Sequence, residues 1–162
     1  MARNSLTVKK CRQKLYVAGP LFSVAERAFN HKLKTQLAHH FDVYLPQEDG
    51  LLIVDLIAKG MEPADAAARV FAADVSAMKR SDILLIVLDG RAVDEGAAFE
   101  LGYASAIGKT CIALQTDFRR LAPFGNNPML TGAISILFES VDALVQWAAG
   151  AATNELQPND WN

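Results

Sequence analysis

Three acids stand among small and apolar residues in the segment 94–100 of this chain. The segment follows the apolar run 83–88, which predicts a buried strand, and it opens a predicted helix. Because α/β proteins place their sites where parallel strands end, Asp94, Glu95 and Glu100 would gather at one edge of a sheet. A carboxylate beside apolar neighbours and a second acid is the arrangement that glycosyl-transfer chemistry requires.

Glu100 is the acid in this segment that is hardest to explain by a structural role. It lies six residues beyond Asp94, between Phe99 and Leu101, past the first helical turn in which the helix dipole favours acids. We therefore predict that Glu100 is functional. Asp94 has a structural alternative, because its carboxylate can cap the helix that begins near Glu95 by accepting bonds from free N–H groups.

Tyr16 and Asp74 are two further polar residues on elements that could reach the same edge. Tyr16 is the one polar-tipped side chain of the predicted strand 15–18, and a buried tyrosine usually needs a partner for its hydroxyl. That partner could be a catalytic carboxylate or a backbone group. Asp74 lies among alanine, valine and phenylalanine in a predicted helix, where it either faces solvent or reaches toward a pocket.

The turn after the first strand argues against an enzyme that uses a phosphate-bearing cofactor. Gly19 and Pro20 stand where a dinucleotide- or nucleoside-triphosphate-binding protein would carry a glycine-rich loop. Pro20 also lacks the N–H that a phosphate cradle would use. The turn could instead be a wall for a flat, neutral ligand, or a plain connection.

The elements that must position these residues alternate between strands and helices. Apolar runs and helical periodicity predict strands at 15–18, 41–45, 83–88, 110–114 and 133–138, and helices at 24–39, 64–79, 95–108 and 141–149. This order implies right-handed βαβ units and a five-stranded parallel sheet in a three-layer α/β sandwich, flavodoxin-like or Rossmann-like. Residues 47–61 are interpreted as a short helix in a long loop over the site, and residues 115–128 as a polar loop.

Length and composition narrow the class of protein. The 162 residues suit one domain, 14–150, between polar tails at 1–13 and 151–162. A net charge of −2 gives no reason to expect nucleic-acid binding. No apolar stretch approaches the roughly 18 residues of a membrane span and no secretory signal is present, so we expect a cytoplasmic protein. Cys11, Cys111 and the histidines show no metal-ligand spacing, so no metal site is expected.

Four motifs, in their order along the chain, resemble the nucleoside 2-deoxyribosyltransferase family. They are Leu15-Tyr16-Val17-Ala18-Gly19-Pro20-Leu21-Phe22, Asp74 in the following helical segment, Asp94-x-Gly-x-Ala-Phe-Glu100-Leu-Gly-Tyr-Ala, and Asn127-Pro128-Met129-Leu130. The resemblance covers roughly residues 14–138. It implies an enzyme that moves 2-deoxyribose between free nucleobases and 2′-deoxyribonucleosides through a covalent glycosyl-enzyme intermediate, with net retention and without a cofactor or metal.

The resemblance also implies roles for individual residues. Glu100 would be the nucleophile that attacks C1′, with Tyr16 hydrogen-bonded to it, and Asp74 and Asp94 would contact the base and help to protonate it as it leaves. Asn127 would serve the site of a neighbouring subunit by binding the sugar 5′-hydroxyl, which implies a homo-oligomer. The other implied substrate-binding residues are Phe22, Gln47 and Gly19.

Two alternatives to a transferase stay open. One is an N-glycoside hydrolase of the same fold, which would cleave nucleosides or nucleotides with water as the acceptor. A nucleotide hydrolase would need phosphate-binding groups near the first turn, where Ser23 and Arg27 are the candidates. The other alternative is a non-catalytic nucleoside-binding module, because fold alone does not imply function.

The chain departs from the family pattern in reading Gly96-Ala97-Ala98, without the hydroxyl that members often carry at the middle position.

Overall fold

A five-stranded sheet forms the centre of the structure, a computed structural model that describes residues 12–117 and 126–151. The strand order is β2-β1-β3-β4-β5, and each neighbouring pair is parallel. The strands are β1 Lys14–Ala18, β2 Asp42–Tyr44, β3 Ile83–Val87, β4 Thr110–Leu114 and β5 Ile136–Phe138. The five-stranded parallel sheet predicted from the sequence is therefore confirmed.

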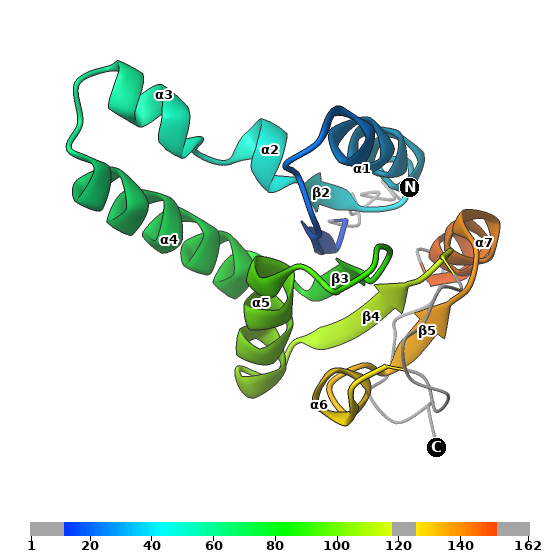
Figure 1. Ribbon diagram of the computed structural model, residues 1–162. Helices are drawn as coiled ribbons and strands as arrows, with labels where there is room; N and C mark the ends of the chain where they lie inside the picture. The colour runs from blue at the N-terminus through cyan, green and yellow to red at the C-terminus, as the bar shows by residue number, and fades with distance from the viewer. Residues whose placement is uncertain (1–11, 118–125, 152–162) are drawn as a thin grey trace, which may run out of the picture.

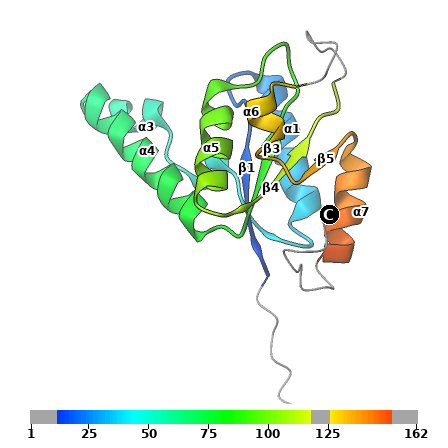
Figure 2. The same ribbon diagram turned by 90° about the horizontal axis from the view of Figure 1, so that it is seen from below.

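Helices cover both faces of this sheet, which gives three layers (Figure 1, Figure 2). One face carries α1 Val24–Leu37 and α7 Val141–Ala151, and the other carries α4 Pro63–Arg80, α5 Glu95–Ala106 and the short α6 Pro128–Thr131. Two more short helices, α2 Pro46–Asp49 and α3 Ile53–Ala58, connect β2 to α4. The predicted three-layer α/β sandwich is confirmed.

The two faces of the sheet bury alternate residues of each strand. In β1, Leu15 and Val17 belong to the core beneath α1 and α7, whereas Tyr16 and Ala18 belong to the core beneath α4 and α5. β3 is buried at every position because helices cover both of its faces. Tyr16 therefore faces the layer that contains the acidic helix α5.

The carboxyl ends of β1 and β3 lie side by side in the middle of the sheet, where Ala18 is the register partner of Ile86. The chain leaves β1 toward one edge of the sheet and leaves β3 toward the other, and open α/β sheets bind ligands at such a switch point. Gly19 lets the first turn lie against β3, because a Cβ there would come 3.2 Å from Val87 Cβ.

The predicted strand 133–138 begins too early, because a short helix precedes it. Asn127 caps α6 through its side chain, and the helix continues far enough that the N–H of Ala133 bonds to Leu130 O. The first bond to β4 therefore comes from Ser135 N, which donates to Cys111 O, and the paired register starts at Ile136. The sequence signal for α6 was the Asn-Pro pair, which suits an N-cap followed by the first helical position.

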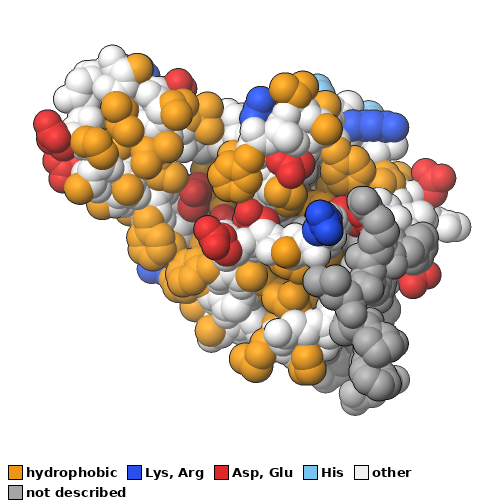
Figure 3. Space-filling model, in the orientation of Figure 1, with side chains coloured by type: hydrophobic (Ala, Val, Ile, Leu, Met, Phe, Trp, Pro, Cys, Tyr) orange, Lys and Arg blue, Asp and Glu red, His pale blue; other side chains and the backbone are white. Residues whose placement is uncertain are grey.

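α3 and the first half of α4 form an arm that projects away from the sheet (Figure 1). A short helix within residues 47–61 was predicted, and two are found, α2 and α3. Hydrophobic side chains are spread over the surface of this arm (Figure 3). The large hydrophobic side chains that are exposed in α3 and in the connection before it are Leu51, Leu52, Ile53, Val54 and Ile57.

Several predictions from the sequence fall on residues outside the described part of the chain. These are most of the N-terminal tail 1–13 with Cys11, most of the polar loop 115–128, and nearly all of the C-terminal tail 151–162. Among the helices that the structure describes, none combines the length and the apolar character needed to cross a membrane.

Candidate active site

Tyr16 and Glu100 meet in the α4–α5 layer. Tyr16 lies in the middle of β1 and its side chain is fully buried, while Glu100 lies on α5 and is partly buried. The Tyr16 hydroxyl donates a hydrogen bond to Glu100 Oε1. Of the two partners that the sequence left open for Tyr16, the structure therefore gives the carboxylate.

Burial changes the acidity of both members of this pair. It raises the pKa of Glu100 to about 7, an effect that the hydrogen bond from Tyr16 opposes and the charges of Asp74 and Asp94 reinforce. Burial and the Glu100 carboxylate also raise the pKa of Tyr16 far above its ordinary value. Tyr16 consequently remains a hydrogen-bond donor, and its bond favours the ionised form of Glu100, the form that can act as a nucleophile.

Asp74, on α4, faces the same cavity as Glu100. Its Oδ1 atom is buried and has no hydrogen-bond partner among the described residues. Burial raises the pKa of Asp74 to about 6. A carboxyl group that lines a cavity and has a raised pKa can hold a proton for a ligand, so the pocket-facing alternative for Asp74 is the one observed.

A mostly apolar cavity of about 360 Å³ lies between α3, α4 and α5. Its size falls in the range of about 300–1,000 Å³ that small-molecule sites occupy. Acidic side chains gather in the hollow beside the arm (Figure 3). The lining consists of Ile53, Ala67, Val70, Phe71, Asp74, Val75, Met78, Gly96, Phe99 and Glu100. The cavity thus offers apolar walls to a flat ligand and two carboxyl groups to its reacting part.

Asp94 is the N-cap of α5. Its Oδ2 accepts a hydrogen bond from Ala97 N at 2.8 Å, which is the structural role that the sequence left open. The charge of Asp94 also contributes to the raised pKa of Glu100. Capping does not preclude contact with a substrate, and the predicted role of Asp94 toward the base stays a prediction.

Gln47 is held by protein groups on both sides of its amide. Its Oε1 accepts a bond from Asn30 Nδ2 at 3.1 Å, and its Nε2 donates to Arg27 O at 3.0 Å. Asn30 is buried and also donates to Pro20 O at 2.8 Å, so it ties the first turn to α2. Sequence reasoning missed Asn30. Its position three residues before Leu33, on the buried face of α1, could have indicated a buried polar side chain that needs hydrogen-bond partners.

The other predicted substrate-binding residues lie apart from the cavity lining. The side chain of Phe22 is 76% exposed. Asn127 is exposed, and its Oδ1 accepts a bond from Met129 N at 2.9 Å. Gly19 lies at the carboxyl end of β1 against Val87. Within one chain the structure therefore brings together Tyr16, Asp74, Asp94 and Glu100, and leaves the roles of Phe22, Gln47, Gly19 and Asn127 as predictions.

Asp89, at the end of β3, has a structural role instead of a place in the cavity. Its carboxylate accepts bonds from Thr116 N at 2.6 Å, Thr116 Oγ1 at 2.7 Å and Asp117 N at 2.8 Å. These bonds join the ends of β3 and β4.

Within residues 12–117 and 126–151, no group of three or more histidine, cysteine or acidic side chains is placed to hold a metal ion.

Comparisons with known proteins gave matches to both the sequence and the fold of this chain. A sequence model of the nucleoside 2-deoxyribosyltransferase family matches residues 15–155. A conserved protein from Enterococcus faecalis V583 has 27% sequence identity and a TM-score of 0.71, over 86% of this chain and 99% of that one. A search among curated proteins gave no match.

Two further solved structures share the fold. A 2-deoxyribosyltransferase from Bacillus psychrosaccharolyticus has 23% identity and a TM-score of 0.71, over 86% of this chain and 95% of that one. A CMP N-glycosidase from Clostridium botulinum has 16% identity and a TM-score of 0.51, over 85% of this chain and 99% of that one. The family match spans the strands, helices and acids that form the site. The chain belongs to the nucleoside 2-deoxyribosyltransferase family.

Proposed function

We propose that this protein moves 2-deoxyribose between nucleobases through a covalent intermediate on Glu100. The observation that carries the proposal is the Tyr16–Glu100 hydrogen bond beside Asp74, whose Oδ1 has no partner within the described part of the chain, at a cavity with apolar walls. A carboxylate nucleophile and a nearby acid are the two groups that a retaining glycosyl transfer needs. The substrates would be 2′-deoxyribonucleosides and free nucleobases, and no residue is assigned to a cofactor.

The two acids would act in sequence. A carboxylate oxygen of Glu100 attacks C1′ of the deoxynucleoside, the bond from C1′ to the base breaks, and the base takes a proton from Asp74 as it leaves. The incoming base then attacks C1′, the ester bond to Glu100 breaks, and the proton of the incoming base returns to Asp74. Two inversions give net retention at C1′. The productive state of the two acids thus carries one proton, on Asp74.

The first turn favours nucleosides over their 5′-phosphates. At the N-terminus of α1, Glu26 Oε2 already accepts bonds from Phe22 N at 3.0 Å and Ser23 N at 2.7 Å. Ser23 Oγ accepts from Glu26 N, and Arg27 donates to the carbonyl oxygens of Leu21 and Phe22. A helix N-terminus binds phosphate through free N–H groups, and here an internal carboxylate bonds to two of them. We therefore favour a nucleoside over a nucleotide substrate.

A chromatographic assay with 2′-deoxyinosine, alone and with adenine or cytosine, tests the proposed function. A new deoxynucleoside that forms only when the second base is present supports transfer. Hypoxanthine and free deoxyribose without exchange would support the N-glycoside hydrolase alternative. Binding of deoxyinosine without any product would support the non-catalytic nucleoside-binding module.

Replacement of Tyr16 by phenylalanine should lower the maximum of the pH–rate profile and move its alkaline limb to higher pH, because the pKa of Glu100 (about 7) is the higher one of the pair that it forms with Asp74 (about 6). The hydrogen bond from the Tyr16 hydroxyl lowers the pKa of Glu100, whereas burial raises it. Without the hydroxyl the pKa of Glu100 is therefore higher, and the nucleophile is protonated over a wider pH range. A hydrogen bond to a charged group contributes about 1.5–3 kcal/mol, which corresponds to a shift of about one unit or more. The dependence of kcat/KM on pH measures this shift, and a profile with an unchanged maximum and an unmoved alkaline limb would contradict the proposed role of Tyr16.

Mixing two inactive variants should restore activity if Asn127 serves a neighbouring copy. Glu100→Ala chains lack the nucleophile but keep Asn127, and Asn127→Ala chains lack the exposed amide but keep Glu100. A mixed oligomer then contains sites that have both groups. Base exchange is measured for each variant alone and after co-refolding. Activity that stays at the sum of the separate variants would count against a shared site.

A further inference from the structure

Tyr44 and Tyr16 form a stacked pair across neighbouring strands. They are Cα partners in the register of β1 and β2, and their rings have centroids 5.4 Å apart at an interplanar angle of 18°. Tyr16 is fully buried, whereas Tyr44 is partly exposed on the edge strand β2. The ring of Tyr44 therefore covers the side of Tyr16 that would otherwise face the edge of the sheet.

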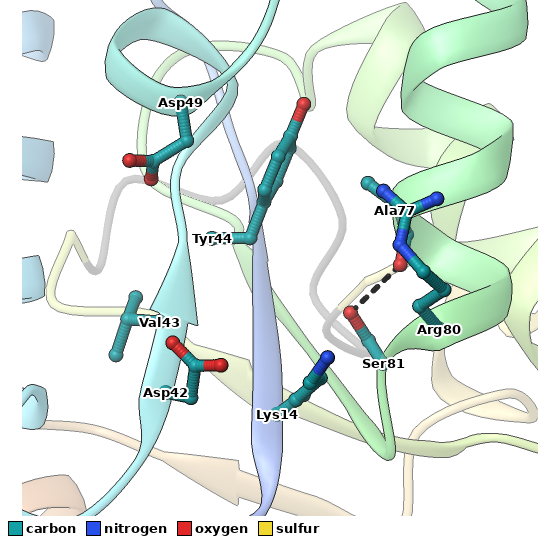
Figure 4. A pocket seen from close by; sticks show the side chains of 8 residues that line it. All are labelled: Lys14, Asp42, Val43, Tyr44, Asp49, Ala77, Arg80 and Ser81. Atoms are coloured by element: carbon teal, nitrogen blue, oxygen red, sulfur yellow. Dashed lines mark hydrogen bonds between the residues drawn. The ribbon is translucent and has the colours of Figure 1, made fainter.

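A polar groove of about 280 Å³ lies beside Tyr44, between β2 and the end of α4. Figure 4 shows the ring of Tyr44 standing between Asp49 on one side and α4 on the other. The groove contains groups of both charges and can hold water, unlike the apolar cavity that contains Glu100. Its lining consists of Lys14, Asp42, Val43, Tyr44, Asp49, Ala77, Arg80 and Ser81.

The groove and the active-site cavity are close neighbours along α4. Asp74 and Met78 line the cavity, whereas Ala77 and Arg80 line the groove, so less than one helical turn separates the two linings. Burial raises the pKa of the Tyr44 phenol, and the charges of Asp74, Asp49 and Glu100 raise it further. The ring pair thus lies between a polar groove and the nucleophile.

The connection between α2 and α3 holds the Tyr44 ring in place. A Cβ on Gly50 would come 3.0 Å from the Tyr44 hydroxyl oxygen and 2.6 Å from Pro46 O. The backbone therefore packs closely against the end of the phenol, and only glycine fits there without a shift. Because Tyr44 stacks on Tyr16 at one face and meets Gly50 at its tip, it has little freedom to swing away from the nucleophile.

We propose that the Tyr44 ring is a barrier that keeps water in the groove away from the glycosyl-enzyme, and so favours transfer over hydrolysis. This inference rests on the proposed function. In the side reaction, a water oxygen attacks C1′, and the C1′–Oε bond to Glu100 breaks. The electron pair returns to the carboxylate, and the water proton passes to solvent, which yields free deoxyribose. A barrier at Tyr44 leaves the base side of the cavity as the route to C1′.

Two substitutions at position 44 separate the ring from its hydroxyl. Tyr44→Leu removes the stacked ring but keeps an apolar side chain, and Tyr44→Phe keeps the ring. With 2′-deoxyinosine and adenine as substrates, the ratio of deoxyribose to 2′-deoxyadenosine should rise about tenfold in Tyr44→Leu, a difference of about 1.4 kcal/mol between two barriers. Tyr44→Phe should keep the wild-type ratio. Arg80→Ala is the matched control, because it shortens another side chain of the groove lining and keeps both tyrosine rings.

The decay of the deoxyribosyl-enzyme in the absence of a free base gives a second readout. Mass spectrometry should show a faster loss of the adduct in Tyr44→Leu than in the wild-type protein, and this does not depend on the rate of transfer. Equal product ratios and equal decay rates in the Leu and Phe variants would overturn the barrier while leaving the transferase intact. A wild-type protein that transfers no base, or that mainly releases deoxyribose, would overturn both the transfer and the barrier.

Discussion

Replacing Glu100 with glutamine is expected to abolish base exchange, with kcat lower by a factor on the order of 10⁴ or more. An amide cannot form the ester to C1′ through which the proposed reaction passes. The change preserves the size of the side chain, and the Tyr16 hydroxyl can still donate to the amide oxygen as it does to Oε1 of the acid. Lost turnover would therefore report the chemistry of the carboxylate and not a rearranged site. Chromatographic measurement of base exchange gives kcat.

Glu95 provides the matched control for this experiment. It is an exposed acid in the first turn of the same helix, and Glu95→Gln should retain the activity of the parent protein. Mass spectrometry of the wild-type protein mixed with substrate should show a deoxyribosyl adduct on the peptide that contains Glu100, and none in Glu100→Gln. Wild-type turnover in Glu100→Gln would exclude Glu100 as the nucleophile.

The same substitution should make the protein more stable at alkaline pH. Burial raises the pKa of Glu100 to about 7, so the folded state binds a proton more tightly than the unfolded chain does. Stability from this carboxyl is present below its unfolded pKa and is lost as the pH rises through about 7. Above that pH, Glu100→Gln should raise the free energy of unfolding by about 3 kcal/mol, and near pH 4 by little. Thermal melts at pH 4 and pH 8 compare the wild-type protein with Glu100→Gln. An equal change in Tm at the two pH values would contradict a buried charge at Glu100.

Much of the fold was predictable because its signals are local. The run from Ile83 to Leu88 is apolar throughout, as a strand covered on both faces must be, and the turn and helix residues between strands fall at βαβ spacing. The error at residues 133–138 had a local cause as well. The β-branched and apolar residues there suit a strand. The backbone N–H groups of Ala133 and Ile134, however, donate to carbonyl oxygens of α6 and are not free to pair with β4.

The site was only partly predictable, because its contacts join distant parts of the chain. Tyr16 and Glu100 lie 84 residues apart, and only the sheet order places the middle of β1 beneath α5. The resemblance to a family named both residues, but periodicity alone could not pair them. The stack of Tyr44 on Tyr16 depends on strand register, and the bonds that hold Gln47 depend on how α2 packs on α1. Neither feature leaves a local signal in the sequence.

Replacing Asp74 with asparagine is expected to lower kcat by about 10²–10⁴-fold, the usual contribution of a positioned general acid. The amide keeps the shape of the side chain but cannot give a proton to the leaving base. In the wild-type protein Asp74 and Glu100 both have raised pKa values and lie at one cavity, so they titrate as a pair. The activity of the wild-type protein should therefore be highest at intermediate pH, and the alkaline limb should disappear in Asp74→Asn.

A change of leaving group separates loss of the proton from loss of the site. The base of 7-methyl-2′-deoxyguanosine is already cationic, so it departs neutral without a proton from the enzyme. If Asp74 is the general acid, Asp74→Asn should release this base nearly as fast as the wild-type protein does, while release of hypoxanthine from 2′-deoxyinosine stays slow. An equal loss of rate with both substrates would mean that Asp74 positions the substrate or Glu100. Because Asp74 lines the cavity and its buried Oδ1 has no partner among the described residues, we expect the rates for the two substrates to diverge.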